Sequence, residues 1–475
     1  MSVLYTRDVP TTTGPTHLGV MMSFAAELLA ARYQMALSLG FHIILACFGV
    51  AFPAMIFVVH RRGLRRDDQD ALALARRWSK ASAVLFAVGA VSGTVLSVEM
   101  GLLWPGLMGT YGDVIGLPFA MEGIAFFTEA VFLGIYLYGW DRLPPRIHLW
   151  TLVPIMVSGL FGTFCIIAVN AWMNSPSGFT LDAEGTVSDI DPVAALFNDA
   201  VWGQFIHMWV AAYIVTGFVV AGVYAWALLR GRVDHHHRLG FRYPFLIAAL
   251  FAIAQPFVGH ITGTRLAEAQ PSKLAAMELA AHTESRAPLT LGGVWIDGEA
   301  RYGLEIPALG SLLATNSFDG VVPGLDEVPE DERPPVTIVH LAFQTMIALG
   351  TALAALAIWG LYVVRRRSEQ QWPRLLLWAA TLAGPAAVLA LQTGWITTEV
   401  GRQPWIVYGT MRVEDAVTTN PGVWISLAVI VVLYSSMGYF AVRTLRRMAQ
   451  RWRQDPTSSL PTPYGPSEER ELVGS

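Results

Sequence analysis

Charged residues are scarce in this chain of 475 residues. Only 14% of them are charged and 54% are hydrophobic, and the mean hydropathy is +0.46. Soluble globular domains carry about 25% charged residues, so the composition excludes an ordinary soluble protein and indicates a polytopic protein of a lipid bilayer. The small net charge of −4 gives no indication of nucleic-acid binding.

Cysteines are also few, and neither a leader nor a repeat is visible. Cys47 and Cys165 lie inside apolar runs without a C-x-x-C or C-x-x-C-H motif, which argues against disulfides, iron–sulfur clusters and c-type haem. Residues 1–18 lack the features of a signal peptide, so we expect the first membrane helix to be uncleaved. Because no period of about 20–50 residues recurs, solenoids and inverted-repeat transporters gain no support.

Nine apolar segments are long enough to cross a bilayer, which requires about 20 residues of helix. They lie at 35–60, 80–104, 115–139, 148–171, 203–229, 243–262, 336–363, 374–397 and 422–445. Residues 17–33 precede them as an amphipathic helix. We therefore predict an all-α membrane protein with an N-terminal segment over 1–34, six transmembrane helices over 35–262 and three more over 336–445.

The connections between these segments alternate in charge. Arginines gather after the first, third, fifth, seventh and ninth segments, whereas intervening connections such as residues 173–198 contain almost no basic residues. Because basic loops face the cytoplasm, we expect the N-terminus outside and the C-terminus inside. The arginines are Arg61, Arg62, Arg65, Arg66, Arg76, Arg77, Arg142, Arg146, Arg230, Arg232, Arg238, Arg242, Arg365, Arg366, Arg367, Arg443, Arg446, Arg447, Arg451 and Arg453.

Two stretches stand apart from the membrane segments. Residues 263–335 form a connection of a length that is usually functional or disordered, and the charge alternation places it outside. Within it, the segment from Lys273 to Glu278 predicts a short helix. Residues 446–475 form a cytoplasmic tail, rich in Pro, Ser and Glu near its end, which we expect to be disordered.

The sequence G-W-I-T-T-E-V-G-R-Q-P-W, residues 394–405, puts Glu399 and Arg402 at the end of the eighth apolar segment. Ionisable groups at membrane depth cost about 2.5–3.5 kcal/mol each, so they need a partner, a cavity or a cofactor. An anion, a cation and a proline that stops the helix suit the binding of a charged cofactor near the membrane surface.

Three further side chains lie at a similar depth on the outer side, namely His42, His207 and Met346. His and Met are the axial ligands of haem iron in many electron-transfer haems. Taken singly, each has an alternative interpretation, because a membrane His is commonly a packing residue or proton carrier and a Met is commonly core. Their concentration in one layer with Glu399 favours a haem site.

Glu122 and Glu129 on the third segment are seven residues apart and therefore share one helix face. They suggest a proton path, because a desolvated carboxyl can exchange protons near neutral pH. The alternative is that they pair with Arg or hydroxyl groups of neighbouring helices.

Other ionisable residues receive more modest interpretations. Glu99 is interpreted as an interfacial residue, and the histidine run at 235–237 as a solvated basic loop without metal. His260 and His340 flank the long connection and could contact a ligand there.

These motifs together resemble subunit I of the bd-type quinol oxidases and their cyanide-insensitive relatives. The resemblance extends from about Arg32 to Trp405 and into the ninth segment. Its markers are R-Y-Q-M-A-L-S-L-G-F-H (32–42), M-E-G-I-A-F-F-T-E-A (121–130), G-W-D-R-L (139–143), V-N-A-W-M-N-S-P (169–176), Q-F-I-H (204–207), K-L-A-A-M-E (273–278), A-F-Q-T-M (342–346) and the 394–405 sequence.

The resemblance implies a quinol:oxygen oxidoreductase of the bacterial cytoplasmic membrane. Such an enzyme oxidises membrane quinol at the outer face, reduces O2 to water and takes protons from the cytoplasm, which makes it electrogenic. The implied partners are subunit II of the oxidase and a single-helix accessory subunit.

The resemblance also implies three haems and assigns residues to them. A low-spin haem b would be held by His207 and Met346, while His42 and Glu399 would each ligate one of the other two haems. These are a high-spin haem b and a haem d or further b-type haem. The remaining implied site residues are Glu122 and Glu129 near the haem pair and the proton route, Arg402 against haem propionate or iron-site charge, and Lys273 and Glu278 for quinol.

One position departs from the pattern, and three alternatives stay open. Gln344 stands where many members have Arg, two residues before Met346, which puts the charge compensation of that haem in question. The alternatives are an oxidase with only b haems, a non-catalytic membrane cytochrome, and a cofactor-free proton-coupled transporter. Haem–copper oxidases are disfavoured because their copper site requires more intramembrane histidines than this chain has.

Overall fold

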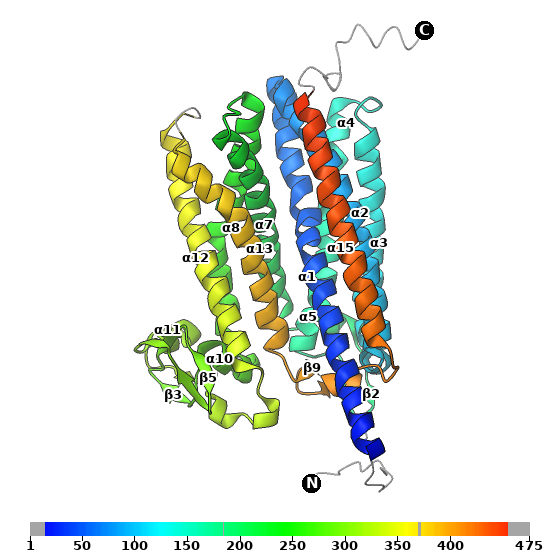
Figure 1. Cartoon of the computed structure of the whole chain (residues 1–475), viewed down its shortest axis with the longest axis vertical. Helices are drawn as coiled ribbons and strands as arrows, with labels where there is room; N and C mark the ends of the chain where they lie inside the picture. The colour runs from blue at the N-terminus through cyan, green and yellow to red at the C-terminus, as the bar shows by residue number, and fades with distance from the viewer. Residues whose placement is uncertain (1–14, 184, 369–371, 455–475) are drawn as a thin grey trace.

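The computed structural model describes residues 15–183, 185–368 and 372–454. Within these ranges nine helices are long and apolar enough to cross a membrane, which confirms the predicted number. They run along the long axis of the molecule, and the long connection packs against one end of the bundle (Figure 1).

Eight of the nine helices are longer than the apolar segments that predicted them, and α5 (Leu152–Asn174), with 23 residues, is about as long as its segment. The nine are α1 (Pro15–Arg66), α2 (Gln69–Leu103), α3 (Pro105–Tyr138), α5, α7 (Val201–Leu229), α8 (His235–Thr264), α12 (Val336–Arg366), α13 (Arg374–Val400) and α15 (Val423–Gln454). The amphipathic helix predicted over 17–33 is the first part of α1 and not a separate element. The predicted tail is helical as far as Gln454, and residues 455–475 lie outside the described residues.

Two ends of the bundle differ in composition. The arginine-rich turns after α1, α7 and α12 lie at one end, here called the arginine end. The opposite end, here called the loop end, carries the long connection and the start of α1 (Figure 1).

Side chains in the short turns of the arginine end start two of the helices. Asp68 caps the N-terminus of α2, and Asp234 accepts a hydrogen bond from the backbone N–H of His237 at 3.0 Å at the start of α8. The histidine run therefore begins a helix and is not a solvated loop. His236 is buried, and its Nε2 lies 3.0 Å from an Arg77 guanidinium nitrogen.

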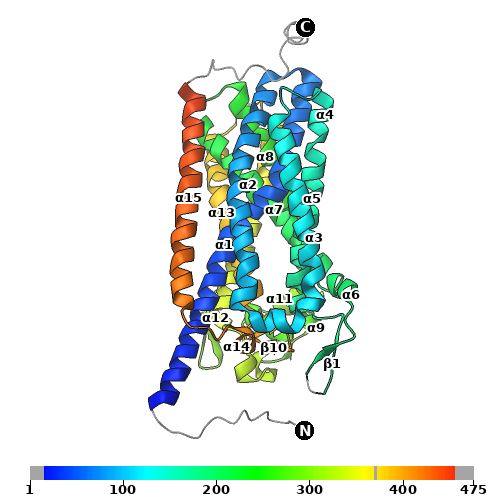
Figure 2. The same cartoon turned by 90° about the vertical axis from the view of Figure 1, so that its right-hand side faces the viewer.

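Two groups of helices lie side by side (Figures 1 and 2). The first consists of α7, α8, α12 and α13, the second of α1, α2, α3, α5 and α15, and α1 and α5 both contact α7. Helices in lipid associate through close van der Waals packing. Gly384 of α13 illustrates this, since a Cβ there would approach the Val219 Cα of α7 to 3.0 Å.

The long connection is compact and mixed in secondary structure. Its first part contains α9 (Leu266–Ala269) and α10 (Pro271–Glu278), and α10 confirms the predicted short helix. The rest consists of β3 (Glu284–Ser285), β4 (Leu289–Leu291), β5 (Val294–Ile296), β6 (Glu299–Arg301), β7 (Leu304–Ile306), α11 (Leu309–Thr315), β8 (Val321–Val322), η1 (Leu325–Glu327) and η2 (Glu330–Glu332). Antiparallel pairs join β3 to β8, β4 to β7 and β5 to β6.

Several short elements complete the fold. They are α4 (Pro145–Trp150), β1 (Thr180–Leu181), β2 (Val187–Ser188), α6 (Pro192–Leu196), β9 (Trp405–Val407), β10 (Met411–Arg412) and α14 (Val413–Ala416). The prediction of an all-α chain missed the strands, because segments of two or three residues carry no alternating pattern that a sequence can show.

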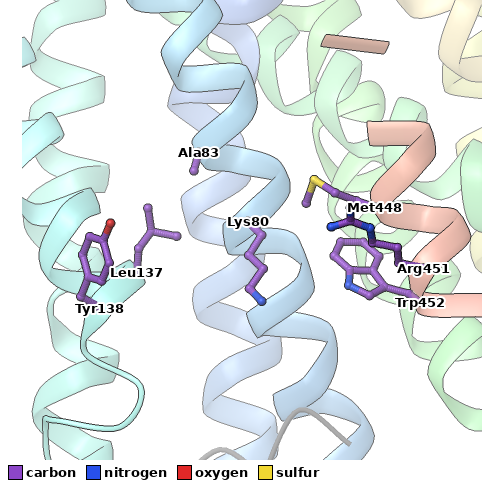
Figure 3. Close-up of a pocket in the computed structure, with 7 residues that line it drawn as sticks. All are labelled: Lys80, Ala83, Leu137, Tyr138, Met448, Arg451 and Trp452. Carbon is purple, nitrogen blue, oxygen red and sulfur yellow. The ribbon is translucent and has the colours of Figure 1, made fainter. Parts of the chain in front are cut away.

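An open groove lies at the arginine end between α2, α3 and α15 (Figure 3). Its lining residues are Lys80, Ala83, Leu137, Tyr138, Met448, Arg451 and Trp452. None of the predicted site residues lines this groove.

Candidate haem and quinol site

The four candidate iron ligands lie on four helices, in the half of the bundle next to the loop end. His42 belongs to α1, His207 to α7, Met346 to α12 and Glu399 to α13. Because α13 contacts both α7 and α12, and α1 contacts α7, the helices that carry these side chains are direct neighbours.

His42 is oriented by α2. Its Nδ1 lies 2.9 Å from the Ser92 hydroxyl, and that hydroxyl donates its own proton to the Gly89 carbonyl at 3.1 Å. Ser92 therefore accepts from His42, so Nδ1 carries the proton and Nε2 presents a lone pair, the state that binds iron. Gly93 makes room for the ring, since a Cβ there would lie 3.0 Å from His42 Cε1.

Glycines also face the ligands proposed for the low-spin haem. A Cβ at Gly259 of α8 would lie 3.5 Å from His207 Cε1, and a Cβ at Gly394 of α13 would lie 2.9 Å from the Met346 sulfur. Among the described residues, the buried Nδ1 of His207 has no hydrogen-bond partner. Buried polar atoms are rarely left without a partner, so this ring nitrogen, together with a methionine that a neighbouring helix accommodates only through a glycine, fits a bound haem.

Glu399 is held by two neighbours. Its Oε1 accepts from the Asn170 amide of α5 at 2.5 Å, and its Oε2 accepts from the Arg402 guanidinium at 2.6 Å. Each carboxylate oxygen keeps a second lone pair for another ligand. Arg402 is only 3% exposed, and its Nε and Nη1 have no partner, which fits an anionic group such as a haem propionate.

The last turns of α13 connect these parts. Gln392 donates to the Gly40 carbonyl of α1 at 2.6 Å, close to His42. Gly394 contacts Met346, and Gly401 lies so close to Lys273 of α10 that a Cβ would approach its Cγ to 3.0 Å. The helix α13 therefore contacts α1, α7 and α12, which carry the other three candidate ligands, and α10, which carries Lys273.

Lys273 and Glu278, the two residues predicted to bind quinol, lie at opposite ends of α10. The Lys273 ammonium donates to Asn174 at 2.7 Å. Burial, and repulsion from Arg402, lower the pKa of Lys273 to about 7, although Glu399 offsets part of the shift. Burial likewise raises the pKa of Glu278 to about 7, and its Oε2 is buried without a partner. Both groups are therefore poised to exchange protons near neutral pH.

Gln344 binds the long connection. Its Nε2 donates to the Thr290 carbonyl at 2.5 Å, and its Oε1 accepts from the Gly292 amide at 2.7 Å. Both ends of the side chain are thus occupied by backbone of the loop. Gln344, which stands where many proteins of the resembled family have Arg, is thus hydrogen-bonded to the backbone of the long connection.

Glu122 and Glu129 share one face of α3, as predicted, and point toward the helices beside it. A Cβ on Gly49 of α1 or Gly159 of α5 would lie 3.6 Å from the Glu129 carboxylate. A cavity of about 10 Å³ adjoins Glu129 and Ser82, which is the size of one water molecule.

Glu99, which the sequence analysis interpreted as an interfacial residue, is buried in the structure. It is 3% exposed, and its Oε1 accepts from Gln34 at 2.9 Å and Ser38 at 3.0 Å, both on α1. The spacing of Gln34, Ser38 and His42, four residues each, was the signal that could have placed these polar groups on one helix face.

Comparisons with known proteins agree on one family. The model described as cytochrome bd terminal oxidase subunit I matches residues 30–452. A Bacillus subtilis (strain 168) protein, provisionally named cytochrome bd menaquinol oxidase subunit I, is 35% identical over 425 residues, which cover 88% of this chain and 96% of that protein. The cytochrome bd ubiquinol oxidase subunit 1 of the same strain is 29% identical over 410 residues, 83% of this chain and 87% of the relative. The structure of bd oxidase from Geobacillus thermodenitrificans is 39% identical with a TM-score of 0.84, covering 90% of this chain and 98% of that one.

Proposed function

Because the chain belongs to the cytochrome bd terminal oxidase subunit I family, we propose that it is the haem-binding subunit of a terminal oxidase that oxidises membrane quinol and reduces O2 to water. The observation that carries the proposal is the layer of His42, His207, Met346 and Glu399 beside a loop that bears Lys273 and Glu278. With nine membrane helices and bacterial relatives, the chain is a multi-pass protein of the cytoplasmic membrane.

The side chains suggest how the cofactors would be held. His207 and Met346 would ligate a low-spin haem b, and His42 and Glu399 would ligate a high-spin haem b and a haem d or further b-type haem. When bound, these groups supply one-electron transfer and O2 chemistry. The chain itself contributes the tautomer of His42, set by Ser92, and the cationic Arg402 for a propionate.

Quinol oxidation releases protons as well as electrons. The helix α10 carries one side chain that can donate a hydrogen bond to quinol and one that can accept a proton from it. Lys273, fixed by Asn174, would donate a hydrogen bond to a quinol oxygen. Glu278, with its free buried Oε2, would accept a quinol proton. Because burial raises the pKa of this carboxyl to about 7, it can take up and release a proton near neutral pH.

Protons for O2 reduction would come from the other side of the membrane. Glu129 lies nearer the arginine end than Glu122 on the same face of α3, beside the water-sized cavity. By the charge of its turns, the arginine end would face the cytoplasm. Releasing quinol protons outside while drawing others from inside would generate a proton-motive force without a pump.

Members of the family work in a membrane complex with a second subunit. We propose subunit II as the partner of this chain, with a single-helix accessory subunit as a further one. Membrane quinol and O2 are the proposed substrates.

The test is the pigment content and O2 uptake of the purified complex. His207→Ala should remove one low-spin b haem from the reduced-minus-oxidised spectrum, whereas His260→Ala, at an exposed histidine that contacts Asn316, should leave all haems in place. A colourless wild-type complex would leave the cofactor-free transporter as the explanation. Haems without quinol-dependent O2 uptake would indicate a non-catalytic cytochrome, and extraction of haem b alone would identify the variant without haem d.

A further inference from the structure

One face of α12 is hydrogen-bonded to the backbone of the long connection. Thr337, His340 and Gln344 follow one another at intervals of three and four residues, so they line up along the helix. The Thr337 hydroxyl accepts from the Trp295 amide at 2.9 Å, and Gln344 binds Thr290 and Gly292 as described above. The turn between β4 and β5 is therefore fixed to α12 through its backbone.

His340 occupies the middle of this face and is fully buried, with 0% exposure. Its Nδ1 lies 2.7 Å from the Met277 carbonyl oxygen and its Nε2 lies 2.8 Å from the Gly292 carbonyl oxygen. A carbonyl oxygen can only accept a hydrogen bond. The His340 ring therefore lies between two backbone acceptors, one in α10 and one in the turn between β4 and β5.

The two carbonyl acceptors of His340 come from different parts of the long connection. Met277 is the residue before Glu278 in the last turn of α10, and the carbonyls of that turn form the negative end of the helix. The carbonyl of Gly292 supplies the second acceptor. His340 thus joins the end of α10 that carries Glu278 to the helix that carries Met346.

We propose that His340 is a positioning residue for quinol oxidation, whose ring fixes the Glu278 turn of α10 and the 290–292 turn to α12. The inference rests on the proposed function, because it assigns a role in the reaction of the same loop. The other end of α10 has a separate anchor, since Gln270 and Lys273 both bind Asn174. Loosening the His340 contacts should therefore displace Glu278 while leaving Lys273 in place.

The test is His340→Gln in the complete complex, because the flexible amide does not reproduce the rigid ring that lies between the two carbonyls. The loss of one buried hydrogen bond changes a rate by up to about tenfold. We expect kcat with quinol to fall about tenfold while KM changes less than about threefold. The haem spectrum, and turnover with tetramethyl-p-phenylenediamine as an artificial donor that bypasses the loop, should match the wild type.

Hydrogen exchange supplies a measurement that does not depend on turnover. Peptides covering residues 286–296 should exchange faster in His340→Gln than in the wild type, whereas His260→Gln, a histidine that contacts another part of the loop, should change neither kcat nor this exchange. If His340→Gln fails to assemble with haem, Thr337→Val removes a milder contact of the same face and should lower kcat in the same direction.

Two results would overturn the inference. One is wild-type kcat together with wild-type exchange in His340→Gln, or in Thr337→Val where the former does not assemble. The other is a rise in KM with kcat unchanged, since that would mean a loss of binding without displacement of the proton acceptor. A wild-type complex that does not oxidise quinol would instead refute the proposed function.

Discussion

At the scale of single residues, glycines on neighbouring helices accommodate three of the four candidate ligands. His42, His207, Met346 and Glu399 could be selected because ionisable and sulfur-containing side chains are conspicuous in apolar runs. The glycines that face three of them lie on other helices and look like any other small residue of a membrane span. The partner of Gln344 was equally hidden, because it is loop backbone more than 50 residues away.

Glu278 provides a pH-dependent prediction at this scale. Burial raises the pKa of its carboxyl to about 7, so the group is neutral and unable to accept a proton at lower pH and is ionised at higher pH. The kcat for quinol oxidation should therefore rise with pH below about 7 and level off above it.

Glu278→Gln should remove this rising limb and lower kcat by about 100-fold, the contribution expected of a general base, with all haems still bound. Glu268→Gln, a substitution of another carboxyl in the same loop, serves as the control. A pH profile in Glu278→Gln that still rises through pH 7 would assign the titration to another group.

At the scale of elements, helices were predictable and their mutual contacts were not. Runs of apolar residues longer than the bilayer identify spans by length alone, which is why all nine were found. The strands of the long connection were missed because β4 with β7 and β5 with β6 each pair over only three residues. Their position depends on α12, through side chains that the sequence does not mark as partners of the loop.

The contact between α12 and α13 gives a prediction at the element scale. Gly394→Ala would place a methyl group 2.9 Å from the Met346 sulfur, which is closer than van der Waals contact, so the sulfur must move. Because a Met ligand raises the potential of a haem, displacing it should lower the midpoint potential of the low-spin haem b and shift its absorption band.

The matched control for this change is Gly350→Ala on α12, where a Cβ would meet no atom within 4 Å. Spectra and a redox titration of both variants provide the measurement. An unaltered low-spin haem in Gly394→Ala would argue against Met346 as its ligand.

At the scale of the whole molecule, the asymmetry between the two ends determines which way electrons and protons would move. The candidate ligands and the long connection lie toward the loop end, whereas Glu129 lies nearer the arginine end of α3 than Glu122 does. The direction of charge separation across the membrane therefore depends on which end of the bundle faces the cytoplasm. Only the arginine distribution indicates orientation, since the fold itself would be the same either way up.

Accessibility to a membrane-impermeant maleimide would establish the orientation. Tyr302 in the long connection is 87% exposed, and Val233 between α7 and α8 is 55% exposed. The native Cys47 and Cys165 are both buried, so they should contribute little background. In intact cells Tyr302→Cys should be labelled, while Val233→Cys should react only after the membrane is opened. The reverse pattern would place the long connection inside. Quinol oxidation would then release its protons inside while the O2 chemistry draws protons from outside, which reverses the polarity of the proposed charge separation.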